Sequence, residues 1–161
     1  MQGVGPLERT ALDARATSQL RLNLGICQAR AGKLADAERV LAETAASGTA
    51  TGEVWMRLGE VRVALGKLEE AQSALETAKN MSDVPSPALV RFILAGAYDR
   101  SRRPSEASYE AEKAIEIDRT LASLKNPNLT LLVTGEAEYL MGLAYAAPVQ
   151  QYPRSEHALG F

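Results

Sequence analysis

The side chains best suited to covalent chemistry are few and far apart in this sequence. The chain has one cysteine, Cys27, and one histidine, His157, near opposite ends. A reactive thiol needs a neighbouring cation or histidine that stabilises the thiolate, and none stands out near Cys27, so we expect a core cysteine. A metal site or a Cys/His nucleophile pair would require the two residues to meet, and we expect neither.

The charged residues predict solvated surfaces rather than a site. Carboxylates are spread along predicted helix surfaces, at Glu69, Glu70, Glu110, Glu112 and Glu116. No pair of them suggests acid–base catalysis, and the glycine-rich phosphate motifs GxGxxG and GKS/T are absent. A basic group, Arg100, Arg102 and Arg103, predicts a solvated turn, with binding of an acidic partner or a phosphate as the alternative. We therefore predict no enzymatic activity, no metal and no cofactor.

Length and composition limit the number of domains and the classes of partner that we expect. A chain of 161 residues suits one domain, and a net charge of −2 with 24% charged residues favours neither nucleic acid nor an anionic membrane as partner. The start, MQGVGPLERT, lacks the pattern of a signal peptide. No run of about 18 apolar residues predicts a membrane span. We expect a cytoplasmic protein that does not insert into a membrane.

The element that would have to position any site is a helix pair over residues 54–78. Apolar residues recur at helical spacing in two stripes, Val54, Leu58, Val61 and Leu65, then Leu68, Ala71, Ala74, Leu75 and Ala78. Gly66-Lys67 separates the stripes, as expected for a glycine that ends a helix. Gly59 costs about 1 kcal/mol inside a helix, so we expect close approach of the two helices there. Two helices cannot bury both stripes, so the unit needs neighbours.

This stretch resembles the tetratricopeptide repeat family. Trp55, Leu58 and Gly59 match the motif of its first helix, and Ala71 and Ala78 match the second. Arg62, Leu75 and Asp83 stand where the family usually has Tyr, Phe and Pro. The resemblance implies that Trp55 packs between the helices of a repeat; a role in stacking on a ligand is the alternative.

Further copies follow the repeat period of the family. Leu24-Gly25, Gly32-Lys33-Leu34 and Ala37 all precede their counterparts in the first pair of stripes by the same offset, which equals that period. The third copy has Leu94-Ala95, Tyr98, Ala107 and Ala114, and a weaker fourth has Met141-Gly142 and Tyr145. We predict a leading segment or short helix at 1–17, repeats at 18–51, 52–87 and 88–118, an insertion at 119–128 and a partial repeat at 129–161. The leading segment is either the leading turn of the next helix or the remnant of a preceding one. Residues 129–133 could instead form a strand. Thr51 is a candidate cap for the helix that follows it.

The resemblance implies an all-α, right-handed superhelical solenoid of three helix pairs and a partial fourth. Its concave face would bind a peptide or a partner helix. The residues expected to line that groove are Leu22, Asn23, Ile26, Arg30, Met56, Arg57, Glu60, Phe92, Ile93, Asp99, Tyr139, Leu140 and Leu143. This set is more apolar than a solvated face should be, which favours a binding surface. The alternative is that some of these residues contact the leading helix or neighbouring repeats.

The same resemblance argues against one subfamily. Chaperone-binding members grip a terminal carboxylate with Lys, Arg and Asn, but of the matching positions only Arg57 carries the right charge. We therefore expect a protein-interaction scaffold for an apolar segment. The alternatives are a structural segment that oligomerises, through an uncapped C-terminal end, and the non-catalytic repeat region of a larger enzyme.

Overall fold

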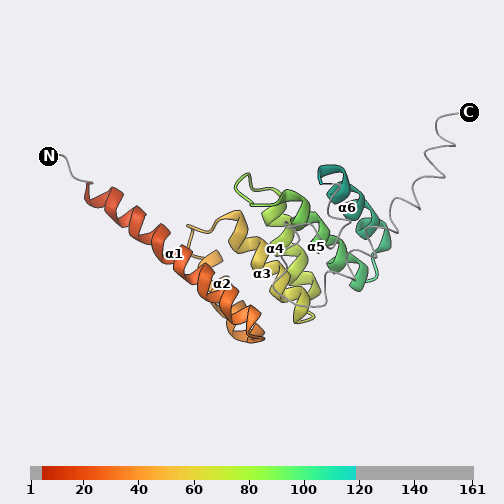
Figure 1. Cartoon of the computed structure of the whole chain (residues 1–161), viewed down its shortest axis with the longest axis horizontal. Helices are drawn as coiled ribbons and strands as arrows, with labels where there is room; N and C mark the ends of the chain where they lie inside the picture. Colours follow the sequence, from red (N-terminus) through yellow and green to blue (C-terminus); the bar gives the residue numbers. More distant parts are fainter. Residues whose placement is uncertain (1–4, 119–161) are drawn as a thin grey trace, which may run out of the picture.

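The computed structural model describes residues 5–118, and within them the protein is all-helical (Figure 1). The helices are α1 (Pro6–Arg30), α2 (Leu34–Ala45), α3 (Gly52–Ala64), α4 (Leu68–Lys79), α5 (Pro87–Arg100) and α6 (Pro104–Ile117). The insertion predicted at 119–128, the partial repeat at 129–161, and Tyr139, Leu140 and Leu143 lie outside the described residues. No described helix is long and apolar enough to cross a membrane.

In the turn between the two helices of each pair, one residue has a left-handed backbone conformation. Gly32 and Gly66 have φ of 81° and 78°, as expected for glycines that end a helix, and both turns join the helices predicted from the stripes. In the third pair Arg102 takes this place with φ of 62°. The turn geometry is therefore retained where the glycine is not, at the cost of strain in a residue with a Cβ.

Two glycines let the helices of a pair approach closely. A Cβ built on Gly25 would lie 2.7 Å from Cγ of Leu41, and one on Gly59 would lie 2.4 Å from Cγ of Leu75. Leu41 and Leu75 are separated along the chain by the same offset as the two glycines. The first two pairs therefore share the same internal contact, as the predicted close approach requires.

The start of α3 departs from prediction, because Thr51 holds the N-cap position without a side-chain hydrogen bond. Asp83 from the α4–α5 loop caps the helix instead, where its Oδ1 accepts a hydrogen bond of 2.9 Å from the Gly52 amide. A Cβ on Gly52 would lie 2.9 Å from Cα of Val84, so only glycine admits this loop. At α5, Pro87 is the first helical residue, a position that suits proline because a backbone N–H there would have no partner within the helix.

Each helix packs mainly on its neighbours in sequence, and α3 also contacts α1 and α5. One hydrophobic cluster spans α1–α4 and includes Leu22, Leu41 and Leu58. A second spans α3–α6 and includes Met56 and Phe92. Trp55 is partly buried and packs against both, which fits the structural role expected of it. The core is thus shared between successive pairs.

The leading segment is not a separate helix but the start of the next one, which is one of the two possibilities that the sequence left open. α1 runs unbroken from Pro6 to Arg30, so residues 6–17 are its first half. This half contributes no residue to the hydrophobic clusters and extends away from the other helices (Figure 1). The shared core thus begins in the second half of α1.

Candidate binding sites

The apolar residues predicted to line a groove lie in the core. Leu22 is buried among α1, α2 and α3 residues, and Met56, Phe92 and Ile93 are buried in the cluster that spans α3–α6. Their apolar character therefore reflects packing between neighbouring pairs, the alternative that the sequence left open. The structure thus places Met56, Phe92 and Ile93 in the core rather than on an open surface.

The polar residues of the predicted groove behave differently. Arg57 and Glu60 are buried and pair at 2.9 Å between Nη1 and Oε1. Asn23 and Arg30 are exposed, while Ile26 and Asp99 are half-buried. The structure thus brings Met56, Phe92 and Ile93 together, and Arg57 with Glu60, but does not form one continuous groove from the predicted set. Peptide binding by these residues stays a prediction.

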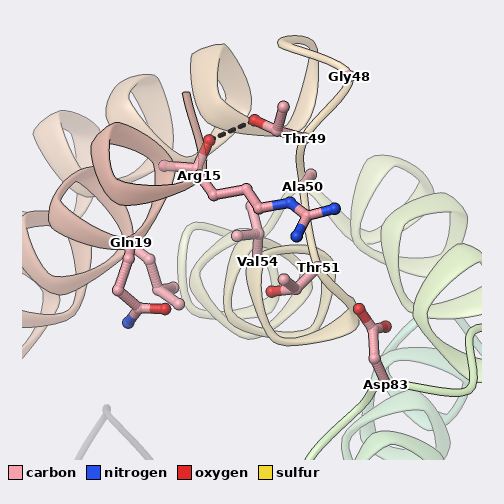
Figure 2. A pocket seen from close by; sticks show the side chains of 10 residues that line it. Arg15, Gln19, Gly48, Thr49, Ala50, Thr51, Val54 and Asp83 are labelled. Carbon is pink, nitrogen blue, oxygen red and sulfur yellow. Dashed lines mark hydrogen bonds between the residues drawn. The ribbon is translucent and has the colours of Figure 1, made fainter. Parts of the chain in front are cut away.

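An open cleft lies instead beside the middle of α1 (Figure 2). Its volume is about 520 Å³, and it lies between α1, the α2–α3 loop and the start of α3. The lining residues are Arg15, Ser18, Gln19, Leu22, Gly48, Thr49, Ala50, Thr51, Val54 and Asp83. Apart from Leu22, sequence reasoning missed them all as site residues, because no motif links a helix face to a loop that lies beyond the next helix.

Local hydrogen bonds hold the wall of the cleft in place. The hydroxyl groups of Ser18 and Thr49 are hydrogen-bonded, which ties the α2–α3 loop to α1. Ser47 donates to the Thr44 carbonyl at 2.6 Å and lies 3.0 Å from the Thr49 hydroxyl. Gly48, with φ of 82°, allows the chain to turn between them. The loop is therefore fixed before any ligand arrives.

The lining of the cleft combines apolar side chains with hydrogen-bonding side chains. Leu22 and Val54 give it an apolar part, and Gln19, Thr49 and Thr51 line it with donors and acceptors. The exposed guanidinium of Arg15 reaches across the cleft (Figure 2) and forms no ion pair within residues 5–118. Within the described part of the chain, no group of His, Cys, Asp and Glu residues could hold a metal ion.

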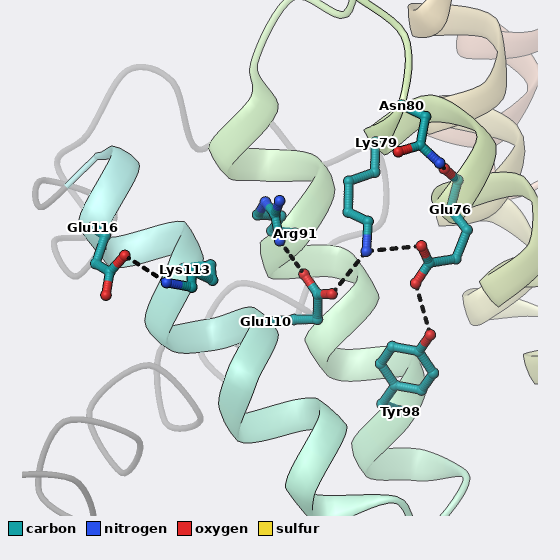
Figure 3. A network of polar contacts seen from close by, with 8 residues as sticks. All are labelled: Glu76, Lys79, Asn80, Arg91, Tyr98, Glu110, Lys113 and Glu116. Atoms are coloured by element: carbon teal, nitrogen blue, oxygen red, sulfur yellow. Dashed lines mark hydrogen bonds and ion pairs between the residues drawn. The ribbon is translucent and has the colours of Figure 1, made fainter.

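A second polar cluster joins α4, α5 and α6 (Figure 3). Glu110 is buried, where it accepts from Lys79 and Arg91 at 3.0 Å each, so the expectation that it lies on a solvated face is wrong. Glu76 lies 2.7 Å from Lys79 and accepts a 2.7 Å hydrogen bond from the Tyr98 hydroxyl. These partners were hidden in the sequence because they come from three different helices.

The pKa values in this cluster follow from burial and pairing. Burial, together with the hydrogen bond to Glu76, raises the pKa of Tyr98 to about 12. Burial alone would raise the pKa of Glu76, but hydrogen bonds from Lys79 and Tyr98 outweigh it and lower that pKa. The ionised carboxylates already have partners, so we assign this cluster a structural role.

Two of the remaining predictions also change. Cys27 is exposed rather than part of the core, because it lies on a side of α1 that no described helix covers. Arg103 is exposed, as expected for a turn, but it is also held in place. It pairs with Glu106 at 3.1 Å, and its guanidinium lies 4.8 Å from the ring centre of Tyr98.

No protein-family model matches this sequence, and no curated protein matches it significantly. The resemblance to tetratricopeptide repeats therefore rests on the residues quoted for it.

Proposed function

We propose that this chain is a protein-interaction scaffold of the tetratricopeptide type that binds a peptide segment in the cleft beside α1. The observation that carries the proposal is the open, pre-formed cleft of about 520 Å³, into which Arg15 brings a guanidinium without an ion-pair partner among the described residues. The two equivalent glycine contacts, one repeat period apart, support the repeat architecture. Leu22, expected on the concave face, lies at the edge of the cleft.

The lining indicates the chemistry of the ligand. A peptide backbone offers N–H and C=O groups that Gln19, Thr49 and Thr51 can bind. Arg15 suits an acidic side chain of the peptide, because a guanidinium forms strong hydrogen bonds with a carboxylate. Leu22 and Val54 supply the apolar part of the lining, which suits an apolar side chain of the peptide. The proposed ligand is therefore an extended segment that carries a carboxylate next to an apolar residue.

The test starts with a photo-crosslinking amino acid at Gln19, which lines the cleft from an exposed position on α1. The crosslinked protein is identified, purified and titrated against the wild type and Arg15→Glu. Loss of a charge-assisted hydrogen bond costs about 1.5–3 kcal/mol, so we expect Arg15→Glu to weaken binding at least about tenfold.

The matched control is Arg9→Glu, which makes the same charge change on the same helix outside the cleft. It should leave the affinity within about twofold of wild type, apart from long-range charge effects that salt screens. Equal affinities for wild type, Arg9→Glu and Arg15→Glu would overturn the assignment of the cleft.

A further inference from the structure

One side of α1 is apolar and uncovered. Leu20 is 69% exposed and Leu24 is 49% exposed, and Cys27 and Ala31 on the same side are also exposed. Their spacing of three and four residues places them on one face of the helix. We name Leu20, Leu24, Cys27 and Ala31 the outer stripe.

The counterparts of the outer stripe are buried in the other pairs. One repeat period further along the chain, Val54 and Leu58 are 1% exposed and Val61 is fully buried. In the third pair, Val90, Leu94 and Ala97 are fully buried too. In both cases the preceding helix pair packs against this side, through α2 on α3 and through α4 on α5. The outer stripe is therefore a packing face for which the described residues supply no cover.

The chain enters α1 differently from the way it enters α3 and α5. α3 is reached through a loop from α2, the helix that packs against it, and α5 is reached in the same way from α4. At the position equivalent to these loops α1 is still helical, and the helix extends back to Pro6. Within residues 5–118, therefore, no helix turns directly from the start of the first pair onto the outer stripe.

The outer stripe is complementary to itself in an antiparallel pairing. If Leu20 faces Leu24 of a second copy, the twofold axis passes beside residue 22, and Leu24 faces Leu20 in return. Cys27 then faces Thr17 of the second copy, which is exposed on the same side of the helix. The two leucines of each copy thus cover those of the other, and two small side chains meet beside them.

Opposite charges meet at the ends of the same pairing. Asp13 of one copy faces Ala31 of the other, and Lys33 lies two residues beyond Ala31, in the turn that follows α1. Asp13 and Lys33 are exposed and form no ion pair within the described part of the chain. The antiparallel arrangement therefore gives each of them a partner of opposite charge.

The role of Lys33 has a precedent within the chain. Its counterpart Lys67 reaches across the interface to Glu38 of α2 at 2.6 Å. The counterpart in the third pair, Arg103, reaches Gln72 of α4 at 3.4 Å. The residue at this turn therefore contacts whichever helix packs on the preceding side.

We propose that two copies of this chain associate through their outer stripes, with the α1 helices antiparallel. The contact is separate from the cleft, so it stands or falls independently of peptide binding. Closed twofold dimers are the commonest symmetric assemblies, and this one would remove two exposed leucines per copy from water.

Sedimentation equilibrium of the full chain tests the association. We expect a dimer for the wild type and at least a tenfold weaker association for Leu24→Glu, which places a charge at the twofold contact. Leu24 is half-exposed, so the variant should fold, as circular dichroism would check. The control is Leu7→Glu, which makes the same change at an 88% exposed leucine outside the stripe and should leave the dimer intact.

A disulfide test fixes the pairing. Thr17→Cys should form an intermolecular disulfide with Cys27 under mild oxidation. Wild-type Cys27 should not crosslink to its own copy, because ten residues of helix separate the two thiols by about 15 Å along the axis. Gln19→Cys, on the cleft side of α1, is the control and should crosslink no faster than wild type.

Three results would overturn the proposal: a monomer at all accessible concentrations, a dimer that Leu24→Glu leaves unchanged, or equal crosslinking by Thr17→Cys and Gln19→Cys. A monomer would leave the stripe to a different protein. The peptide-binding proposal is tested separately, since Arg15→Glu should leave the dimer intact and Leu24→Glu should leave binding in the cleft intact.

Discussion

Single residues without side chains decide how closely the helices of this protein approach. At Gly59 the neighbouring helix is so close that Cγ of Leu75 occupies the space of a Cβ, and Gly25 meets Leu41 in the same way. The helix loses about 1 kcal/mol of propensity at each glycine. The burial of Leu41 and Leu75 offsets this loss, because each fully buried leucine contributes about 1.5–3 kcal/mol.

We predict that Gly59→Ala destabilises the protein despite the better helix propensity of alanine. The new Cβ would lie 2.4 Å from Cγ of Leu75, so the helices must separate, and overpacking of this kind costs about 1–3 kcal/mol. Urea denaturation measures the free energy of unfolding. Gly5→Ala is the control, because nothing lies within 4 Å of its Cβ. Gly59→Ala as stable as wild type would contradict the close contact.

Between elements, polar contacts recur at corresponding places and link each helix pair to the next. Glu38 of α2 meets Arg62 of α3 at 3.2 Å and Lys67 at 2.6 Å. Its counterpart in the next pair, Gln72, donates to the Ser101 hydroxyl at 2.8 Å and meets Arg103. The side chains differ, but the position serves the same interface in both cases.

Glu38 makes the stability of this interface depend on acid. Burial alone would raise the pKa of Glu38, but hydrogen bonds and charge interactions with Lys67 and Arg62 outweigh it and lower that pKa. A carboxyl whose pKa is lower in the folded state stabilises the protein above its unfolded pKa of about 4.5 and loses that contribution as the pH falls through the folded value.

We therefore predict that Glu38→Gln is less stable than wild type at neutral pH and that the difference shrinks as the pH falls below about 4.5. Thermal unfolding at a series of pH values measures this difference. Glu43→Gln on the same helix is the control, because Glu43 is exposed and pairs with Arg39 at only 3.9 Å. A stability difference that does not change with pH would count against the ionised contact.

At the scale of the whole molecule, each helix packs mainly on the helices that precede and follow it in the sequence. α5 is buried along most of its length, whereas the first half of α1 contributes nothing to the hydrophobic clusters. An isolated helix of about 12 residues is marginal in water. Local stability should therefore differ greatly between the first half of α1 and the centre of the structure.

We predict that amide hydrogen exchange is fast over residues 6–17 and slowest over α3 and α5. The Leu24→Glu variant is the appropriate sample, because it removes any protection that association of two copies would give to α1. Mass spectrometry of peptic fragments resolves these segments. Protection of residues 6–17 equal to that of α5 would contradict this distribution of stability.

Local patterns in the sequence determined the helices, their pairing and the turns between them. The apolar stripes, the glycines at 25 and 59 and the Gly-Lys turns depend on short-range geometry, which residue spacing records directly. The close contact at Gly59 was predicted for the same reason, because a glycine inside a helix needs a compensating neighbour.

Only the tertiary structure decided which faces are core and which are open. Leu24 and Leu58 hold the same place in the pattern, yet Leu24 is half-exposed and Leu58 is buried. Helical periodicity shows that a face is apolar but not what covers it. Asp83 capping α3, the pairing of Glu110 and the cleft beside Arg15 likewise depend on segments that meet only in the fold. Long-range approach of separate segments therefore created the cleft, whereas the outer stripe is open because no segment of the described part of the chain packs on it.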